Sequence, residues 1–180
     1  MEPIETRRLS LVPATATTTR LELADPRGLL RLLGADEASE WPSASLREVL
    51  PAFLQQLEED PTCVGWLAWY WILRSGRELV GGGGFKGRPS ADGTVEIGYE
   101  TCERHRRRGY AKEAVDALVQ WAFAQGCVRR VVAETAATNH GSRQVLSALG
   151  FEPRGADSVR GLLRFERRCP DATAEPFRMS

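Results

Sequence analysis

The sequence has few lysines and no surplus of charge of either sign. Lys86 and Lys112 are the only lysines among 24 basic residues, and 24 acidic residues bring the formal net charge to zero at pH 7. Dedicated nucleic-acid-binding proteins carry a strong basic surplus, so its absence argues against that class. Any function of the basic residues must therefore be local.

The sequence also lacks the cysteine patterns that bind structural metals or form redox pairs. Its four cysteines are scattered and include no CxxC pair: Cys63, Cys102, Cys127 and Cys169. This spacing favours reduced thiols, and it predicts no metal site.

Long hydrophobic runs are missing as well. Residues 1–12 contain no apolar segment typical of a signal peptide, and no apolar run approaches the ~20 residues of a membrane span. We therefore expect a cytoplasmic protein. Its 180 residues, 42 % of them hydrophobic, are typical of one globular domain, which we expect at residues 1–169, with a flexible tail at 170–180.

Hydrophobic periodicity predicts a mixed α/β (α+β) fold. Strands are expected at residues 7–12, 66–74, 78–86, 94–101, 127–134, 151–154 and 159–168. Helices are expected at residues 26–33, between Trp41-Pro42 and Pro61, at 110–125 and at 140–149. About seven strands and about four helices in this order predict helices packed around a mixed sheet.

Some boundaries depend on single residues. Asp25 and Pro26 are typical of a helix start, and Gly34 of a helix end. Ser45 and Glu48 have the spacing of a capping box for the second helix, in which Pro51 is expected either to cause a kink or to mark the true start. The Thr- and Pro-rich stretch after Val12 is expected to be a loop.

The run Gly81–Gly84 lies inside an expected strand. It lacks the Gly-Lys-Ser/Thr of a phosphate-binding P-loop and precedes no helix, so we expect a close backbone contact or a bulge. Trp66, Trp69 and Trp71 partly follow the strand period and are expected in the core rather than on a stacking platform.

The stretch from residue 96 to residue 113 is the most informative for function. It runs from a strand through a cluster of arginines, Gly109 and Ala111 into the clearest helix of the chain. A helix N-terminus offers unpaired N–H groups, and small residues let an anion approach them, so a pyrophosphate fits. The alternatives are a solvated charge run and a nucleic-acid contact. The cluster comprises Arg104, Arg106, Arg107 and Arg108.

Three motifs in this order resemble the GNAT superfamily of acyl-CoA-dependent N-acyltransferases. They are Glu96-Ile97-Gly98-Tyr99, Arg106-x-x-Gly109-x-Ala111, and Asn139-x-x-Ser142 followed by Leu149-Gly150-Phe151. Thr6-Arg7-Arg8-Leu9 and Trp41-Pro42 further resemble the branch that contains the ribosomal-protein N-terminal acetyltransferases. The resemblance implies a GNAT-like, mostly antiparallel central sheet.

The resemblance also implies roles for individual residues. The backbone from Arg107 through Arg108, Gly109 and Tyr110 to Ala111, together with the side chain of Arg106 or Arg108, would hold the coenzyme A pyrophosphate. The main chain around Thr101 and Cys102 would pair with the pantetheine arm, and Asn139 and Ser142 would lie beside the thioester. This sequence departs from the family pattern at Arg107, where glycine is frequent, and at Glu103, where proline is frequent.

Acyl transfer to an amine needs a base for the ammonium proton and, less strictly, an acid for the leaving thiolate. Glu96 and Glu100 share one face of the expected strand, and we favour Glu96 as the base, with Glu100 second. Both could instead be surface carboxylates. Ser142 is the candidate acid, or else only completes the first turn of a helix; Cys102 would be the nucleophile if an acyl-enzyme formed.

The sequence thus predicts an N-acetyltransferase that moves an acetyl group from acetyl-CoA to a primary amine by direct attack. The amine could belong to a small molecule or to a protein N-terminus. A CoA-binding regulatory module without turnover and a nucleic-acid-associated protein are the alternatives, and a homodimer is compatible with the sequence. Residues 29–62 and the final strands are expected to line the acceptor side.

Overall fold

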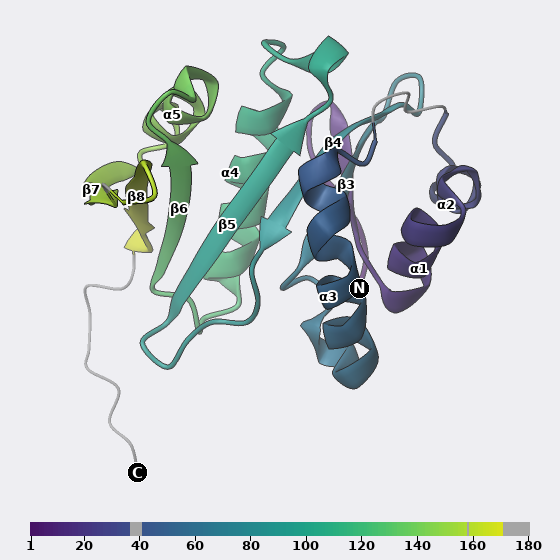
Figure 1. The fold of residues 1–180 in the computed structure, drawn as a ribbon, viewed down its shortest axis with the longest axis horizontal. Coiled ribbons are helices and arrows are strands. Elements are labelled where there is room, and N and C mark those ends of the chain that lie inside the picture. The colour runs from purple at the N-terminus through teal and green to yellow at the C-terminus, as the bar shows by residue number, and fades with distance from the viewer. Residues whose placement is uncertain (37–40, 158, 171–180) are drawn as a thin grey trace.

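The computed structural model describes residues 1–36, 41–157 and 159–170 (Figure 1). Its centre is one mixed sheet of eight strands in the order β1-β2-β3-β4-β5-β6-β8-β7. The expected fold class is confirmed, with one strand more than expected because residues 4–5 pair with 10–11. The strands are β1 (Ile4–Glu5), β2 (Leu9–Pro13), β3 (Ala68–Leu73), β4 (Leu79–Phe85), β5 (Thr94–Thr101), β6 (Arg130–Ala136), β7 (Glu152–Asp157) and β8 (Leu162–Arg168).

The five α-helices of the described residues lie on both faces of the sheet (Figure 1). Trp69 and Trp71 of β3 pack in a core with α4 and α5, whereas the alternate residues Tyr70 and Ile72 pack with α1 and α2. This alternation is the period of two that a strand imposes on its side chains. The α-helices are α1 (Ala16–Ala24), α2 (Pro26–Leu33), α3 (Ala44–Glu59), α4 (Tyr110–Ala124) and α5 (His140–Ala148), with short 3-10 turns η1 (Pro61–Cys63) and η2 (Glu103–His105).

Helix α1 falls where the sequence was expected to form a loop, and that expectation is wrong. Thr15 accepts a hydrogen bond from the backbone N–H of Thr18, and the Thr18 hydroxyl lies 2.7 Å from the Thr15 backbone nitrogen. This reciprocal cap starts the helix despite its β-branched threonines, which favour helix only weakly.

The expected boundaries of α2 are confirmed, whereas the cap of α3 is shifted. Pro26 begins α2, and Gly34 ends it with a φ of 62°. Helix α3 is capped by Ser43, whose Oγ accepts from the N–H of Leu46, rather than by Ser45. Pro51 lies within α3, seven residues after its first residue, so it neither starts nor ends the helix.

The glycine run of β4 is a place of close backbone approach, as expected. A Cβ at Gly84 would collide with the carbonyl of Leu67, and one at Gly82 would collide with the Trp41 ring. The β3–β4 register also shifts between Trp71 and Ile72.

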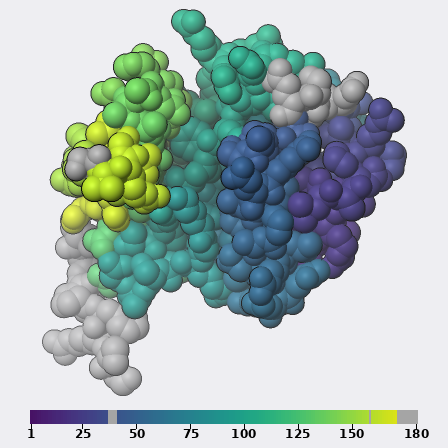
Figure 2. Space-filling model, in the orientation of Figure 1, coloured from purple at the N-terminus to yellow at the C-terminus, as the bar shows by residue number. Residues whose placement is uncertain are grey.

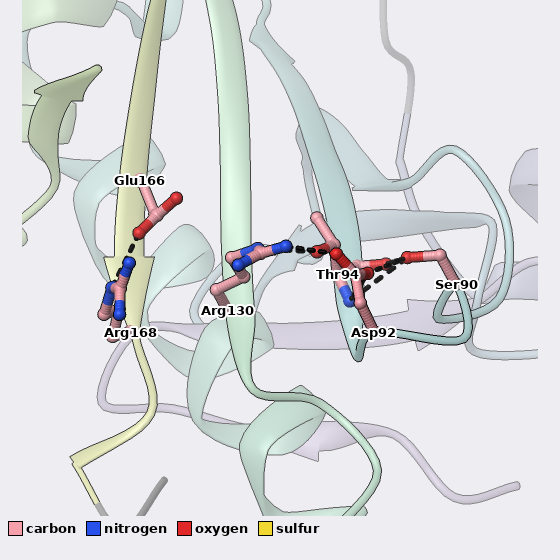
Figure 3. Close-up of polar contacts among 6 residues, drawn as sticks. All are labelled: Ser90, Asp92, Thr94, Arg130, Glu166 and Arg168. Carbon is pink, nitrogen blue, oxygen red and sulfur yellow. Dashed lines mark hydrogen bonds and ion pairs between the residues drawn. The ribbon is translucent and has the colours of Figure 1, made fainter. Parts of the chain in front are cut away.

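Among the strands of the described residues, β5 and β6 are the only parallel neighbours, and they pair over Thr94–Glu96 and Arg130–Val132. A network of polar side chains stabilises the first residues of this pairing (Figure 3). Arg130 Nε donates to Thr94 Oγ1 at 2.6 Å, Arg130 also forms an ion pair with Asp92, and Ser90 donates to Asp92 at 2.7 Å. Beyond Glu96 the two strands diverge, as Figure 1 shows.

Within the described ranges no helix is long and apolar enough to cross a bilayer. The expected tail lies almost wholly outside the described residues, which end at 170.

Candidate active site

Two cavities meet at the C-terminal end of β5. The first, about 560 Å³, we call the polar cavity; the second, about 340 Å³, we call the apolar cavity. Tyr99 and Glu100 line both. In the space-filling view the surface is hollowed between α3 and α5, where β5 lies recessed (Figure 2).

The polar cavity lies where β5 has left β6. The N–H of Cys102 bonds to the Val80 carbonyl of β4, so strand alternation turns the main-chain groups of Tyr99 and Thr101 the other way, toward this opening. Both residues line the polar cavity. Strand backbone that no described strand pairs with therefore faces this cavity.

The N-terminus of α4 forms another wall of the polar cavity. Gly109, in the N-cap position, has a φ of 80°, and no side chain caps the helix at this end. The first N–H groups of α4 are then available to an anion, with the positive end of the helix dipole behind them. Gly109, Tyr110 and Ala111 all line the cavity, as does Lys112.

Of the four clustered arginines, two line the polar cavity. They are Arg106 and Arg107, and Arg106 Nε also donates to the Thr101 carbonyl at 3.3 Å. Arg108 is not among the lining residues, and Arg104 forms an ion pair with Glu78.

Arg107 explains one departure from the family pattern. Its φ is 61°, in the left-handed region, which glycine adopts without the clash that a Cβ brings. At this position the backbone has the conformation that glycine adopts most easily, which accounts for the glycine that is frequent in the family.

Arg8 contacts the loop that precedes α4 and the first turn of that helix, and the sequence analysis did not single out this residue. Arg8 Nη1 donates to the Arg108 carbonyl at 2.9 Å, its guanidinium lies 4.6 Å from the centre of the Tyr110 ring, and Arg8 forms an ion pair with Glu113 at 2.6 Å. Partial burial alone would raise the pKa of Glu113, but hydrogen bonds from Thr6 and Arg8 outweigh it and lower that pKa. The Thr6-Arg7-Arg8-Leu9 motif was the available signal.

Thr101 and Cys102 differ in their placement. Thr101 lines the polar cavity, whereas Cys102 is buried and does not. The Cys102 N–H bonds to Val80 and its carbonyl accepts from His105, so its main chain is already engaged within the protein.

Asn139 and Ser142 both line the polar cavity. Asn139 Oδ1 accepts from the Ser142 N–H at 3.0 Å and so caps α5. The Ser142 Oγ lies 2.9 Å from the Tyr99 hydroxyl, which brings two hydroxyls together where the cavities join. Burial raises the pKa of Tyr99, so this phenol stays protonated.

His105 lines the polar cavity and contains a buried polar atom without a partner among the described residues. The ring is buried, its Nε2 lies 3.1 Å from Arg104 Nε, and its Nδ1 has no hydrogen-bond partner among the described residues. Buried polar atoms rarely lack a partner, so a bound ligand is a reasonable source of one.

The floor of the apolar cavity is made of small residues. On one face of the sheet, Ala68, Gly84 and Gly98 form one cross-strand row, and Tyr70, Gly82 and Glu100 form the next. The missing side chains leave a hollow that α3 covers with Leu46, Val49 and Phe53 among other residues.

Glu22 of α1 lines the apolar cavity, and the sequence reasoning did not single it out. Only 3 % of Glu22 is exposed; Trp41 Nε1 and the Tyr70 hydroxyl each donate to one of its oxygens at 2.7 Å. Burial raises the pKa of Glu22 to about 7, against the lowering effect of those hydrogen bonds, and the charge of Glu100 adds to the rise.

The two candidate bases occupy different places on the same face of β5. Glu100 lines both cavities and accepts a hydrogen bond from Ser43 Oγ at 2.6 Å. Glu96 lines neither cavity, and its carboxylate forms an ion pair with Lys86.

The acceptor-side expectation holds only in part. Residues of α3 line the apolar cavity, but no described residue of β7 or β8 lines either cavity. The remaining walls come from α1, Trp41 and the β3–β5 face. The final strands therefore lie outside the site.

The polar cavity fits coenzyme A. A helix N-terminus and two arginines suit a pyrophosphate, and the strand backbone of Tyr99 and Thr101 suits an amide-bearing arm. Residues 8–152 match the family model of the acetyltransferase (GNAT) domain. The chain belongs to the GNAT family and is an acyl-CoA-dependent N-acetyltransferase, which binds acetyl-CoA.

The chain is similar to an uncharacterized N-acetyltransferase, YjdG, of Bacillus subtilis (strain 168). The two are 33 % identical over 148 residues, which cover 82 % of this chain and 88 % of YjdG.

Solved structures share the fold at lower identity. A ribosomal-protein-S5-alanine acetyltransferase from Vibrio fischeri is 14 % identical with a TM-score of 0.66, and the match covers 97 % of this chain and all 100 % of that one. RimL, a ribosomal L7/L12 alpha-N-protein acetyltransferase solved with coenzyme A, is 18 % identical with a TM-score of 0.62, over 93 % of this chain and 98 % of that one.

Proposed function

We propose that the protein transfers the acetyl group of acetyl-CoA directly to a primary amine, with acetyl-CoA in the polar cavity and the amine in the apolar cavity. The observation that carries this proposal is that the cavities join at Tyr99 and Glu100. A thioester in one cavity and an amine in the other can meet only at such a junction. A protein that merely binds CoA has no need of the second cavity.

The proposed cofactor contacts follow the polar cavity from end to end. The pyrophosphate is held by the N–H groups of Arg107–Ala111 and by the side chains of Arg106 and Arg107. The pantetheine arm runs along the open backbone of Thr101, past Asn139. The support for this path is that all of these residues except Arg108 line one continuous cavity.

Glu100 acts as the general base in this proposal. Its carboxylate takes a proton from the ammonium group, directly or through a water molecule, and the neutral nitrogen then attacks the thioester carbon. A C–N bond forms, and the oxyanion of the intermediate is stabilised by the backbone N–H groups of Tyr99 and Thr101. As the C–S bond breaks, the positively charged nitrogen releases its extra proton to water. The thiolate receives a proton from the paired hydroxyls of Ser142 and Tyr99, which regain theirs from water.

Glu100 is preferred over Glu96 because it is the carboxylate at the junction. Glu96 stands four residues earlier on the same face and is ion-paired with Lys86. The two residues therefore form a matched pair for experiment, since one substitution removes the proposed base and the other removes an equivalent charge outside the cavities.

The test measures thiol release from acetyl-CoA with a panel of primary amines. We expect Glu100→Gln to lower kcat/KM by about 10²- to 10⁴-fold, the usual range for a lost general base, and Glu96→Gln to lower it by less than about tenfold. The reverse ranking would restore Glu96 as the base. Tight CoA binding without amine-dependent thiol release would identify a non-catalytic module instead.

A further inference from the structure

The apolar cavity contains a second carboxylate for which the acetyl-transfer step has no use. Glu22 lines this cavity but not the polar cavity, so it stands away from the thioester. It is nonetheless almost fully buried. A buried carboxylate needs compensation, and in a ligand cavity the ligand can supply it.

Glu22 and Glu100 reach this cavity from different elements, α1 and β5. Tyr70, which donates to Glu22, and Glu100 stand in one cross-strand row with Gly82 between them. The ring of Trp41, the other donor to Glu22, covers Gly82. Two carboxylates thus line one cavity, whose lining also includes Gly84 and Gly98.

No free basic side chain balances this pair among the described residues that line the cavity. Lys86 is the only basic residue there, and it is ion-paired with Glu96. The other walls are mostly aliphatic and aromatic, and include Leu46, Val49 and Phe53. Such a site suits a ligand with two positive charges and an apolar stem.

We propose that Glu22 is a specificity-determining residue of the acceptor site, and that it selects small amines that carry a second cationic group besides the reacting one. The inference rests on the proposed function, since it assigns the reacting amine to Glu100. The second cation then lies against Glu22, whose oxygens each hold one donor and retain a lone pair for another. An acceptor that carries a carboxylate in that place is repelled.

A purely structural role for Glu22 makes a different prediction. If Glu22 only links α1 to Trp41 and Tyr70, its substitution changes kcat/KM for all acceptors by the same factor. A role in specificity changes the ratio between acceptors of different charge, whatever happens to the overall rate.

The experiment compares three four-carbon amines that differ at the far end: 1,4-diaminobutane, butylamine and 4-aminobutanoate. With the wild-type protein and saturating acetyl-CoA, we expect kcat/KM for the diamine to exceed that for butylamine by about tenfold or more, as the loss of a charge-assisted hydrogen bond implies. We expect 4-aminobutanoate to be the poorest acceptor. In Glu22→Gln the three values should fall within about threefold of one another.

Asp25→Asn is the matched control. Asp25 lies three residues further along, is ion-paired with Arg31 on the surface, and lines neither cavity. The ratio of diamine to butylamine should be unchanged in this variant. If the ratio changes in Asp25→Asn as well, the preference arises from the overall charge of the protein, and the proposed role of Glu22 is wrong.

The outcomes separate the two proposals. If no amine releases thiol although CoA binds, the proposed function fails. If all three amines react but the wild type does not prefer the diamine, or Glu22→Gln slows every amine equally, the inference alone fails.

The second cation could also belong to a peptide acceptor. The dipeptide amides Ser-Lys and Ser-Glu test this source. A preference for Ser-Lys that disappears in Glu22→Gln would support the proposed role of Glu22 with a peptide as the acceptor.

Discussion

The two cavities differ in how the chain builds them. The polar cavity comes from two continuous stretches, residues 99–112 and 139–148, whereas the apolar cavity draws on α1, Trp41, α3 and three strands. The first is therefore a local structure that a motif can reveal. The second exists only once distant segments have folded together, so its chemistry depends on packing.

Glu22, the buried acid of the apolar cavity, should make the free energy of unfolding depend on pH. This is the largest effect that we expect from packing. Below pH 4.5 Glu22 is protonated in both the folded and the unfolded chain. As the pH rises from 4.5 to about 7, the unfolded chain ionises first, so stability falls; above about 7 the loss is complete. The shift of 7 − 4.5 units corresponds to about 3 kcal/mol.

Glu22→Gln lacks this group and provides the comparison. Urea unfolding of both proteins from pH 4.5 to 8 should show the wild type losing about 3 kcal/mol relative to the variant. Every other titratable group is the same in both proteins, so the comparison isolates Glu22. Parallel curves would mean that Glu22 is ionised and compensated in the free protein.

In the polar cavity a single side chain should affect one substrate only. Arg106→Ala is expected to raise the KM for acetyl-CoA about tenfold or more, since it removes a charge-assisted contact, and to leave the KM for the amine unchanged. Initial rates with each substrate varied in turn provide the measurement. Arg108→Ala is the control, since Arg108 does not line the cavity. A larger effect of Arg108→Ala would assign the phosphate contact to that residue.

Much of the polar cavity could be predicted because its residues are near neighbours in sequence. The helix start at Gly109 and the asparagine cap of α5 follow from local patterns, and both line the cavity. The role of Arg8 could not be predicted from local patterns, because its contact with the Arg108 carbonyl spans 100 residues.

The apolar cavity could not be predicted in the same way. Glu22 stands on a helix whose threonines suggested a loop, and its partners Trp41 and Tyr70 are 19 and 48 residues away. The period of two did place Glu96 and Glu100 on one face. It could not tell which of them the cavities would reach, because that depends on where β6 diverges from β5.

The backbone at Arg107 allows a finer test of the local design. Arg107→Ala and Arg107→Gly remove the same charge, but only glycine accepts a φ of 61° without steric cost. We expect the glycine variant to be the more stable of the two by about 1 kcal/mol in urea unfolding, with equal rises in the KM for acetyl-CoA. An alanine variant of equal stability would imply that the loop adopts another conformation.

The polar network at the start of β5 should matter least to either cavity. Hydrogen bonds from Ser90 and Thr94, with a further contribution from Arg130, lower the pKa of Asp92 to about 2 (Figure 3). The stability from this depressed pKa is present above pH 3.8 and is lost as the pH falls through about 2. Asp92 is exposed, so solvent screens the interaction and little stability is at stake near pH 7.

Asp92→Asn therefore tests whether the divergence of β5 and β6 depends on how their pairing begins. The network lies at Thr94, whereas Tyr99 and Glu100, which join the cavities, lie near the other end of the strand. We expect both KM values and kcat to stay within about twofold of the wild type at pH 7, as is usual for a surface substitution. A larger change in the KM for acetyl-CoA would mean that the opening between the strands is set by their first pairs, and the polar cavity would then depend on distant packing much as the apolar one does.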